Sequence, residues 1–353
     1  MTNLDFLIIA AGVQAAFLVA LVVLIVLTRL FSMRRRARIA GPKTLVDEAW
    51  RAFMTGDAPS SGILRHLRRL PRHVALDTLI HYAGRTAPET WRRLTTAVAN
   101  QSWVRAIRRG GRSRHWWRRL DAGRLLAVAG RPVDAPLLLR LLADEHPAVV
   151  IAVISALEHV QSTALLAGVL ERVPHLTPTV QAFAAASLQR VRTGLPAMVA
   201  KYLTGPRDRP GLAAYVDLAG RVSAPELRAP ITELAEHPDF EVRVAVARAL
   251  GNYPAGESIG ALRRLFGDKA WQVRAQAIQS LGKIGAATVD LFQRALSDAS
   301  WWVRLRGALA LTRSGPVGRD ALLAAEVGPD AFARDMARLV LGLPPAALAE
   351  YQR

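Results

Sequence analysis

Residues 268–282 read DKAWQVRAQAIQSLG, and residues 298–304 read DASWWVR. Each stretch begins with an aspartate and carries a Val-Arg pair, and another Val-Arg pair stands at Val242 and Arg243. The three valines are separated by 31 and then 30 residues. A motif that returns at a nearly constant interval indicates a tandem repeat of one structural unit.

Three columns of mainly apolar residues follow the same period, with steps of 31 residues and a last step of 30. They are Val149, Val180, Gly211, Val242, Val273 and Val303; Leu157, Leu188, Ala219, Leu250, Leu281 and Leu311; and Leu138, Val169, Ala200, Ile231, Leu262 and Phe292. The pattern predicts two helices in each unit, for example near residues 138–143 and over residues 147–157. Because one such pair cannot bury its apolar face alone, we expect stacked pairs to form a solenoid.

Aspartates stand in the expected turns between the two helices of a unit. Asp144, Asp268 and Asp298 each precede the column valine by five residues, whereas Asp239 precedes Val242 by three. A carboxylate at this place can cap the second helix and meet the positive end of its dipole. We therefore expect these aspartates to cap the second helices.

The two stretches quoted above resemble HEAT repeats, in particular the short variety found in phycobilin-lyase-like proteins. The resemblance covers roughly residues 118–341 and is specific for residues 242–311. It weakens where Val150, Gln181 and Leu212 replace the arginine. It implies an all-α fold, a right-handed α-solenoid of HEAT-like helix pairs. The signatures of ankyrin and tetratricopeptide repeats are absent from the sequence.

The same resemblance implies a structural role for the repeated arginines. Arg243, Arg274 and Arg304 would pair with turn aspartates such as Asp268 and Asp298 and form a ladder along the stack. These positions are therefore expected to hold the repeats together, with ligand binding as the alternative.

The N-terminal part of the chain carries a long apolar run. From Phe6 to Leu27, Gln14 is the only strongly polar residue, and the run would span roughly 33 Å as a helix. It is too long for a cleavable signal peptide and predicts one transmembrane helix before the solenoid. Arg29 and the arginines that follow it predict a single-pass protein of the cell membrane, with the N-terminus outside and the large domain cytoplasmic.

Basic residues gather before the repeats. Residues 34–124 hold 21 Lys and Arg against 6 Asp and Glu, whereas residues 125–353 hold 25 against 21. This asymmetry predicts an electrostatic partner, and anionic lipid is the partner that the predicted anchor would place nearby. The candidate contacts to lipid headgroups are Arg34, Arg35, Arg36, Arg38, Arg65, Arg68, Arg69 and Arg72.

We expect four segments along the chain. Residues 1–32 form the N-terminal tail and transmembrane helix, and residues 33–61 a basic juxtamembrane segment that ends in a linker near residues 56–62. Residues 62–130 form divergent N-terminal helix pairs. Residues 131–353 form the HEAT-like repeat solenoid with its C-terminal cap.

Two tryptophan pairs are candidates for binding a partner. They are Trp116 and Trp117, followed by Arg118 and Arg119, and Trp301 with Trp302. Aromatic groups beside arginine can anchor a protein interface or stack on bases. The alternative is that one member of each pair packs in the core, because adjacent residues of a helix do not share a face.

Chemical motifs of the common enzyme classes are missing from the sequence. It contains no cysteine, its eight histidines show no metal-ligand spacing, and it has neither a phosphate-binding loop nor a nucleophile elbow. We predict a protein that is not an enzyme, without catalytic residues, cofactor or metal.

The predicted function is a membrane-anchored protein-protein interaction scaffold or adaptor on the cytoplasmic face of a bacterial inner membrane. Its client would be a protein, and the resemblance implies a membrane enzyme such as a glycosyltransferase. One alternative is a HEAT-like DNA glycosylase or nucleic-acid binder, although the predicted anchor makes nucleic acid the less favoured partner. Another is a bilin lyase-like chaperone, which the repeat type allows.

Overall fold

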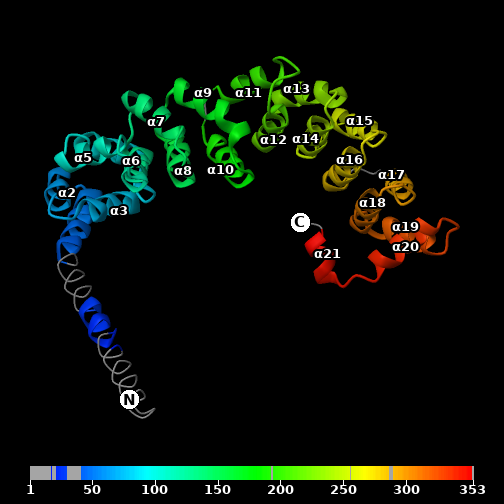
Figure 1. Ribbon diagram of the computed structural model, residues 1–353, viewed down its shortest axis with the longest axis horizontal. Helices are drawn as coiled ribbons and strands as arrows, with labels where there is room; N and C mark the ends of the chain where they lie inside the picture. Colours follow the sequence, from blue (N-terminus) through cyan, green and yellow to red (C-terminus); the bar gives the residue numbers. More distant parts are fainter. Residues whose placement is uncertain are drawn as a thin grey trace, which may run out of the picture. The chain divides into compact units, whose positions relative to one another are not determined.

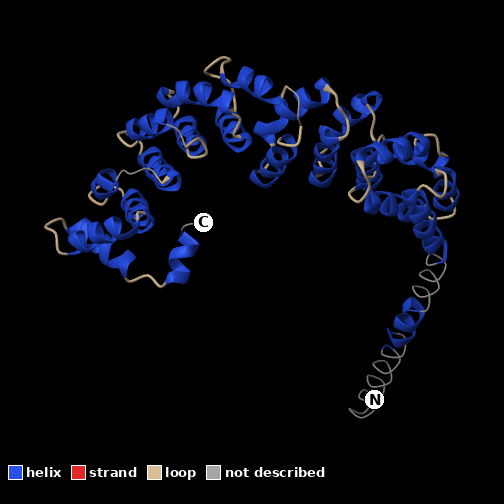
Figure 2. Ribbon diagram, turned by 180° about the vertical axis from the view of Figure 1, so that it is seen from behind, coloured by secondary structure: helices blue, strands red, loops and turns tan. Residues whose placement is uncertain are grey.

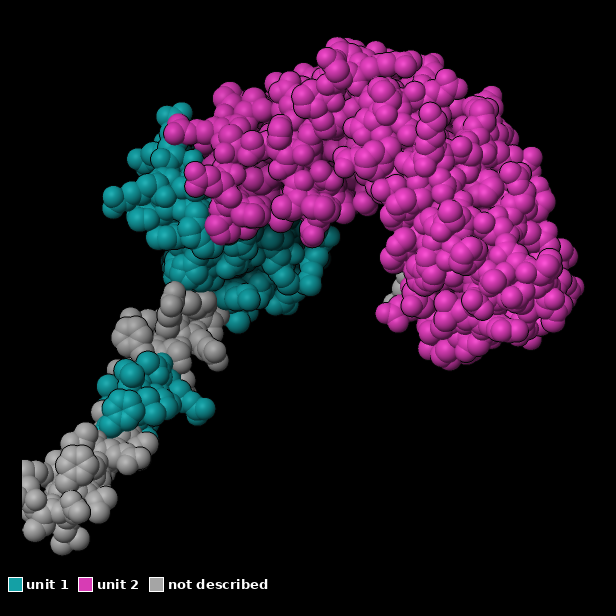
Figure 3. All heavy atoms as spheres, turned by 45° about the vertical axis from the view of Figure 1, so that its right-hand side comes forward, with its two compact units in different colours: residues 1–130 teal, residues 131–353 magenta. Residues whose placement is uncertain are grey.

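The computed structural model describes residue 17 and residues 21–29, 41–191, 194–254, 256–285 and 289–351. Throughout these ranges the regular elements are helices, and they fall into two compact units, residues 1–130 and residues 131–353 (Figure 3). The all-α prediction is confirmed for the part of the chain described.

Unit 1 contains a helical segment over residues 41–55 and five further helices. These are α2 (Ser60–Leu67), α3 (Arg72–Ala83), α4 (Pro88–Val98), α5 (Ser102–Gly110) and α6 (Trp116–Ala129). Val46 and Trp50 of the first segment share one buried cluster with Ile63 and Leu67 of α2. The Trp50 ring also stacks on Tyr82 of α3, with ring centroids 4.0 Å apart.

The expected linker near residues 56–62 is therefore shorter than predicted, because α2 begins at Ser60. The basic segment ahead of it is also not separate from the domain that follows. Its described part, residues 41–55, packs its apolar face into the core of unit 1.

The predicted membrane location is corrected by the helices of the structure. Among the residues described, none of the helices is both long and apolar enough to cross a membrane. Most of the Phe6–Leu27 run lies outside the described residues. The described residues thus supply no spanning helix for the predicted single-pass topology, with its outer N-terminus and cytoplasmic domain.

Unit 2 is a stack of helix pairs. The first helices of the pairs are α7 (Ala135–Leu142), α9 (Thr163–Arg172), α11 (Leu195–Leu203), α13 (Arg228–Glu233), α15 (Gly256–Leu265), α17 (Val289–Ala295) and α19 (Gly315–Glu326). The second helices are α8 (Pro147–Ser155), α10 (Pro178–Leu188), α12 (Leu212–Val222), α14 (Phe240–Leu250), α16 (Trp271–Ile284), α18 (Trp301–Arg313) and α20 (Ala331–Leu341). Short 3-10 turns are η1 (Pro132–Asp134), η2 (Ala156–Glu158), η3 (Val173–His175), η4 (Pro225–Leu227) and η5 (Leu234–Glu236), and α21 (Pro345–Tyr351) follows the last pair.

The pairs stack in chain order, as the repeat period predicts. Helix α14 packs between α12 and α16, and α16 packs between α14 and α18. Figures 1 and 2 show the second helices from α8 to α18 along the inner side of the curve of unit 2, with the first helices outside them. The inner surface of this unit is therefore made by one kind of helix.

The predicted apolar columns form the core of this stack, with two exceptions. All members of the column from Leu157 to Leu311 are buried, and so are Val242, Val273 and Val303. Ala200 is only half-buried. Gly211 is exposed and stands just before α12 with φ +73°, and a Cβ there would lie 2.3 Å from the Pro174 Cβ. The column is thus interrupted where the chain needs a left-handed turn pressed against the preceding pair.

Two of the turn aspartates bind the residue just before the helix rather than the first turn of the helix. The Oδ1 atoms of Asp268 and Asp298 accept hydrogen bonds from the N–H groups of Ala270 and Ser300, both at 2.8 Å. Those N–H groups belong to the residues just before α16 and α18, so these aspartates close the turn rather than cap the helix. Asp239, where the spacing slips, does cap α14 by accepting from Glu241 N at 2.8 Å.

Candidate functional site

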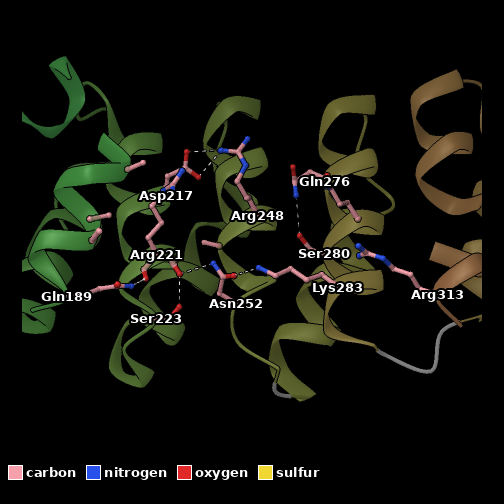
Figure 4. A pocket seen from close by; sticks show the side chains of 16 residues that line it. Gln189, Asp217, Arg221, Ser223, Arg248, Asn252, Gln276, Ser280, Lys283 and Arg313 are labelled. Atoms are coloured by element: carbon pink, nitrogen blue, oxygen red, sulfur yellow. Dashed lines mark hydrogen bonds and ion pairs between the residues drawn. The ribbon is translucent and has the colours of Figure 1, made fainter. Parts of the chain in front are cut away.

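The candidate site is a groove on the inner side of unit 2, formed by α10, α12, α14, α16 and α18, with a volume of about 620 Å³ (Figure 4). Its floor is made of small residues, among them Gly220 and Ala249. A Cβ at Gly220 would lie 2.7 Å from the Cα of Ala249, so α12 and α14 can approach this closely only with glycine at that position. Polar side chains stand around this floor.

Hydrogen bonds across neighbouring repeats fix the polar side chains of the groove. Arg248 Nη1 donates to both carboxylate oxygens of Asp217, at 2.9 and 2.7 Å. Asn252 Nδ2 donates to the Gly220 carbonyl oxygen at 2.8 Å, and Lys283 donates to Asn252 Oδ1. We call these contacts the groove rungs, and Figure 4 shows that they join α12, α14 and α16.

The groove is positively charged. Arg221, Arg248, Lys283 and Arg313 line it, whereas Asp217 is the one carboxylate among its lining residues. Burial raises the pKa of Asp217 above its ordinary value, although the charge of Arg248 and its hydrogen bonds oppose the shift. A concave surface with this balance attracts negatively charged groups.

The opposite ends of the second helices carry an Arg–Asp ladder. Arg243 donates from Nε and Nη2 to the carboxylate of Asp268, at 2.6 and 2.9 Å. Arg274 donates in the same way to Asp298, at 2.8 Å for both bonds. Each pair links one repeat to the next, and its bidentate geometry is the strong form of this interaction.

These contacts shift the pKa values of the ladder. Burial alone would raise the pKa of Asp298, but hydrogen bonds from Arg274 and from the Ser300 N–H, together with the charge of Arg274, bring it below its ordinary value. Asp268 behaves in the same way with Arg243 and the Ala270 N–H. The ladder therefore keeps these carboxylates charged.

Each ladder arginine also clamps the turn before its own helix. Arg274 Nη1 donates to the carbonyl oxygens of Asp268 and Lys269, at 2.8 and 3.1 Å, and Arg243 donates to those of His237 and Pro238. These carbonyls lie six and five residues before the arginine. We call this contact the arginine clamp.

Arg304 keeps the clamp but differs from the expected ladder. It donates to the carbonyl oxygens of Asp298 and Ala299, at 2.8 and 3.0 Å. Its guanidinium carbon lies 4.5 Å from the ring centroid of Phe332. Among the described residues, no carboxylate pairs with Arg304 at ion-pair distance as Asp298 pairs with Arg274.

Arg119 makes the same clamp in unit 1, which the sequence reasoning missed. Its Nη1 donates to the carbonyl oxygens of Ser113 and Arg114, at 3.1 and 2.9 Å. The signal was present, because Arg119 stands three residues after Trp116 at the start of α6, as Arg274 stands three after Trp271 at the start of α16. Arg119, which the sequence suggests as a candidate for partner binding, thus contacts the backbone of the turn before its own helix.

Both members of each tryptophan pair are exposed, which corrects the expectation that one would pack in the core. Trp116 and Trp117 are the first residues of α6, and Trp301 and Trp302 are the first residues of α18. In each pair the two rings lie nearly perpendicular, at 84°. The four side chains are between 41% and 50% exposed, so neither ring of a pair is part of the core.

The remaining candidate residues lie apart from the groove. Arg65 on α2 is exposed, and so are Arg68, Arg69 and Arg72. Their role in lipid contact stays a prediction. Arg34, Arg35, Arg36 and Arg38 lie outside the described residues. In the described part of the chain, no group of three or more His, Asp or Glu is placed to hold a metal ion.

Part of the helix stack in unit 2 matches a known protein family. Residues 195–282 and 259–342 match the family described as HEAT repeats, which covers α11 to α20. These matches support a HEAT-repeat protein. The matched residues thus extend on both sides of residues 242–311, where the sequence resemblance is specific. Such repeats suggest a non-enzymatic scaffold fold, and they commonly mediate protein-protein interaction.

Other comparisons add little to this picture. No curated protein matches the chain. A solved structure of an engineered protein from the Northeast Structural Genomics Consortium is similar over 88% of this chain and 91% of its own, with 16% identity and a TM-score of 0.32.

Proposed function

We propose that the protein is an interaction scaffold whose groove in unit 2 binds an acidic, extended segment of a partner protein. The observation that carries the proposal is the balance of charge in the groove, with four cationic side chains and one carboxylate. That carboxylate, Asp217, is already paired with Arg248. The lining of the groove therefore carries a net positive charge.

The groove rungs prepare this surface for binding. Asn252 is held by the Gly220 carbonyl and in turn accepts from Lys283, so these side chains have fixed positions. Binding then costs less side-chain entropy than on a surface of free lysines and arginines. Single exposed ion pairs contribute only about 0.2–1 kcal/mol, so a useful affinity needs several contacts along the groove.

The length of the groove favours an extended segment. It is lined by five successive second helices, from α10 to α18. Neighbouring packed helices are about 8–10 Å apart, so the four intervals make the groove roughly 32–40 Å long. An extended chain covers about 3.3–3.6 Å per residue, so roughly 11 residues would fill it.

A labelled glutamate peptide tests the proposal. Fluorescence anisotropy should show that a peptide of roughly 11 glutamates binds the full chain, with affinity that falls as salt rises. Arg221→Glu and Lys283→Glu should each weaken binding roughly three- to tenfold, because each replaces an attraction by a repulsion. Arg263→Glu, an exposed residue of the outer helix α15, is the matched control and should change binding little.

Two outcomes would contradict the proposal. One is a peptide affinity that Arg221→Glu and Lys283→Glu leave unchanged. The other is equal loss with Arg263→Glu, since that would show attraction to net charge rather than to the groove.

A further inference from the structure

Unit 1 contains a second basic concavity, separate from the groove of unit 2. A cleft of about 730 Å³ lies between the start of α3, the end of α5 and the start of α6. Arg72, Arg109, Arg112 and Arg118 line it, together with Trp117. The start of α3 and the turn from α5 to α6, which follows it in the chain by more than 35 residues, thus bring four guanidinium groups and one indole ring to the same cleft.

The charge of this cleft is not balanced by its own carboxylate. Asp121 is the one acidic residue of the lining, and its Oδ1 lies 3.9 Å from Nη1 of Arg124, outside the cleft. None of the four cleft arginines forms an ion pair with a carboxylate among the residues that the structure describes. Gathering four like charges is unfavourable, and a multiply charged anion would relieve it.

Local contacts fix the walls of the cleft. The clamp of Arg119 holds the turn between α5 and α6, on the carbonyls of Ser113 and Arg114. A Cβ at Gly110 would lie 3.1 Å from the carbonyl oxygen of Arg118, so the end of α5 lies close against α6. The Trp117 ring stacks on His115, with centroids 4.5 Å apart and an interplanar angle of 20°. It nevertheless remains 50% exposed.

We propose that this cleft binds a nucleotide, with its phosphates on the arginines and its base against Trp117. Guanidinium groups match phosphate oxygens in charge and in bidentate geometry. An exposed indole ring offers the kind of surface on which bases stack, with tolerance of base identity. The volume falls in the range of small-molecule sites, about 300–1,000 Å³.

A nucleotide explains more of the cleft than an inorganic anion does. Phosphate alone would use the arginines but would leave Trp117 without a role in binding. An acidic peptide would meet the arginines through single negative charges, whereas adjacent phosphates deliver several charges to one place. The proposal concerns unit 1 alone and does not depend on the peptide groove of unit 2.

Isothermal titration calorimetry on the full chain tests this site with three probes. ATP without magnesium should bind at one site per chain, whereas tripolyphosphate should bind about tenfold more weakly, since it lacks the stacked base. Adenosine, which lacks the phosphates, should bind weakest. GTP and UTP should bind within about tenfold of ATP, because stacking tolerates different bases.

Substitutions assign the binding to the cleft. Arg112→Gln and Arg118→Gln should each weaken ATP binding about tenfold or more, and Trp117→Leu should remove the advantage of ATP over tripolyphosphate. Arg65→Gln on α2 makes the same change of charge outside the cleft. Trp302→Leu is the matched control for Trp117, because Trp302 is also the second residue of its helix and is 49% exposed. Both controls should retain wild-type affinity.

Three results would each contradict the proposal. The first is that ATP does not bind, and the second is that the cleft variants bind ATP as well as the controls do. The third is that tripolyphosphate binds as tightly as ATP and Trp117→Leu changes neither affinity, which would identify a site for phosphate alone. Circular dichroism of every variant should match the wild-type spectrum, and Arg118→Lys should recover part of the affinity that Arg118→Gln loses.

Discussion

The two ends of the second helices in unit 2 use the same chemical pair for different purposes. At one end Arg274 and Asp298 are 17% and 11% exposed, and at the other Arg248 and Asp217 are 50% and 26% exposed. The pKa of Asp298 lies below its ordinary value, whereas that of Asp217 lies above it. The difference is that backbone N–H and arginine donors outweigh burial at Asp298, and burial outweighs Arg248 at Asp217. An aspartate–arginine pair 24 to 31 residues apart therefore does not by itself show whether it serves the fold or the surface.

The largest loss of stability is expected in the core that lies between the two ends of the second helices. Leu281→Ala should lower the free energy of unfolding by about 2–5 kcal/mol, because it empties a fully buried site in α16. Urea denaturation followed by circular dichroism measures the loss. Leu323→Ala on α19 removes the same atoms from an exposed side chain and should cost well under half as much. Equal costs would mean that the column from Leu157 to Leu311 is not the core of the stack.

Removing an arginine from the ladder should lower the free energy of unfolding more than removing one from the groove. Arg274→Ala should destabilise the protein by about 1–3 kcal/mol, because Asp298 loses its charged partner and two turn carbonyls lose the arginine donor. Arg248→Ala should cost less than about 1 kcal/mol, because its pair is half in solvent. The same denaturation curves give both numbers. A larger loss of stability for Arg248→Ala than for Arg274→Ala would mean that the groove pair, and not the ladder, holds the fold together.

Asp298 and Asp217 should change the stability of the protein in opposite directions as pH falls. The lowered pKa of Asp298 gives a stabilisation that is complete above about pH 4 and is lost as pH falls through the folded pKa. The raised pKa of Asp217 does the opposite: relative to an asparagine variant, the wild type gains stability as pH falls through the folded pKa toward about 4.

Comparing the wild type with Asp298→Asn and with Asp217→Asn between about pH 3 and pH 6 tests this sign. The stability differences should slope in opposite directions as pH changes. Parallel slopes would show that the two carboxylates share one environment, and the comparison would fail.

The smallest effect is expected at the exposed aromatic residues. Trp302→Ala should change the free energy of unfolding by about 0.5–1 kcal/mol, because its side chain is 49% exposed and its ring contact is with Trp301, which is exposed as well. Thermal unfolding provides the measurement. A loss comparable to that of Leu281→Ala would place one member of the pair in the core after all.

The period of the sequence predicted most of the architecture of unit 2. Residues such as Val273 and Leu281 face the core because identical units bury the same positions, and that repetition is visible in the sequence. The exceptions have local causes. Gly211 needs a positive φ, and a Cβ on it would strike Pro174 of the preceding pair. That contact depends on the three-dimensional stacking of the pairs, and the period does not encode it.

The candidate site was less accessible to sequence reasoning. Asp217 and Arg248 are 31 residues apart, as are Asn252 and Lys283, so the repeat period could have found the groove rungs. The cleft of unit 1 has no such signal, because Arg72 and Trp117 meet through the packing of helices that follow no clear period.

The arginine clamp has a consequence for how such chains can grow. Arg334 makes the same clamp on the carbonyl oxygens of Gly328 and Pro329. The five clamped turns read Ser-Arg, His-Pro, Asp-Lys, Asp-Ala and Gly-Pro, yet the clamp bonds themselves go to main-chain oxygens that every residue possesses. The clamp thus places no demand on the side chains of the turn. A duplicated unit can bring its own turn sequence and still be clamped, so modules can be copied, exchanged or allowed to diverge at their turns without losing this contact.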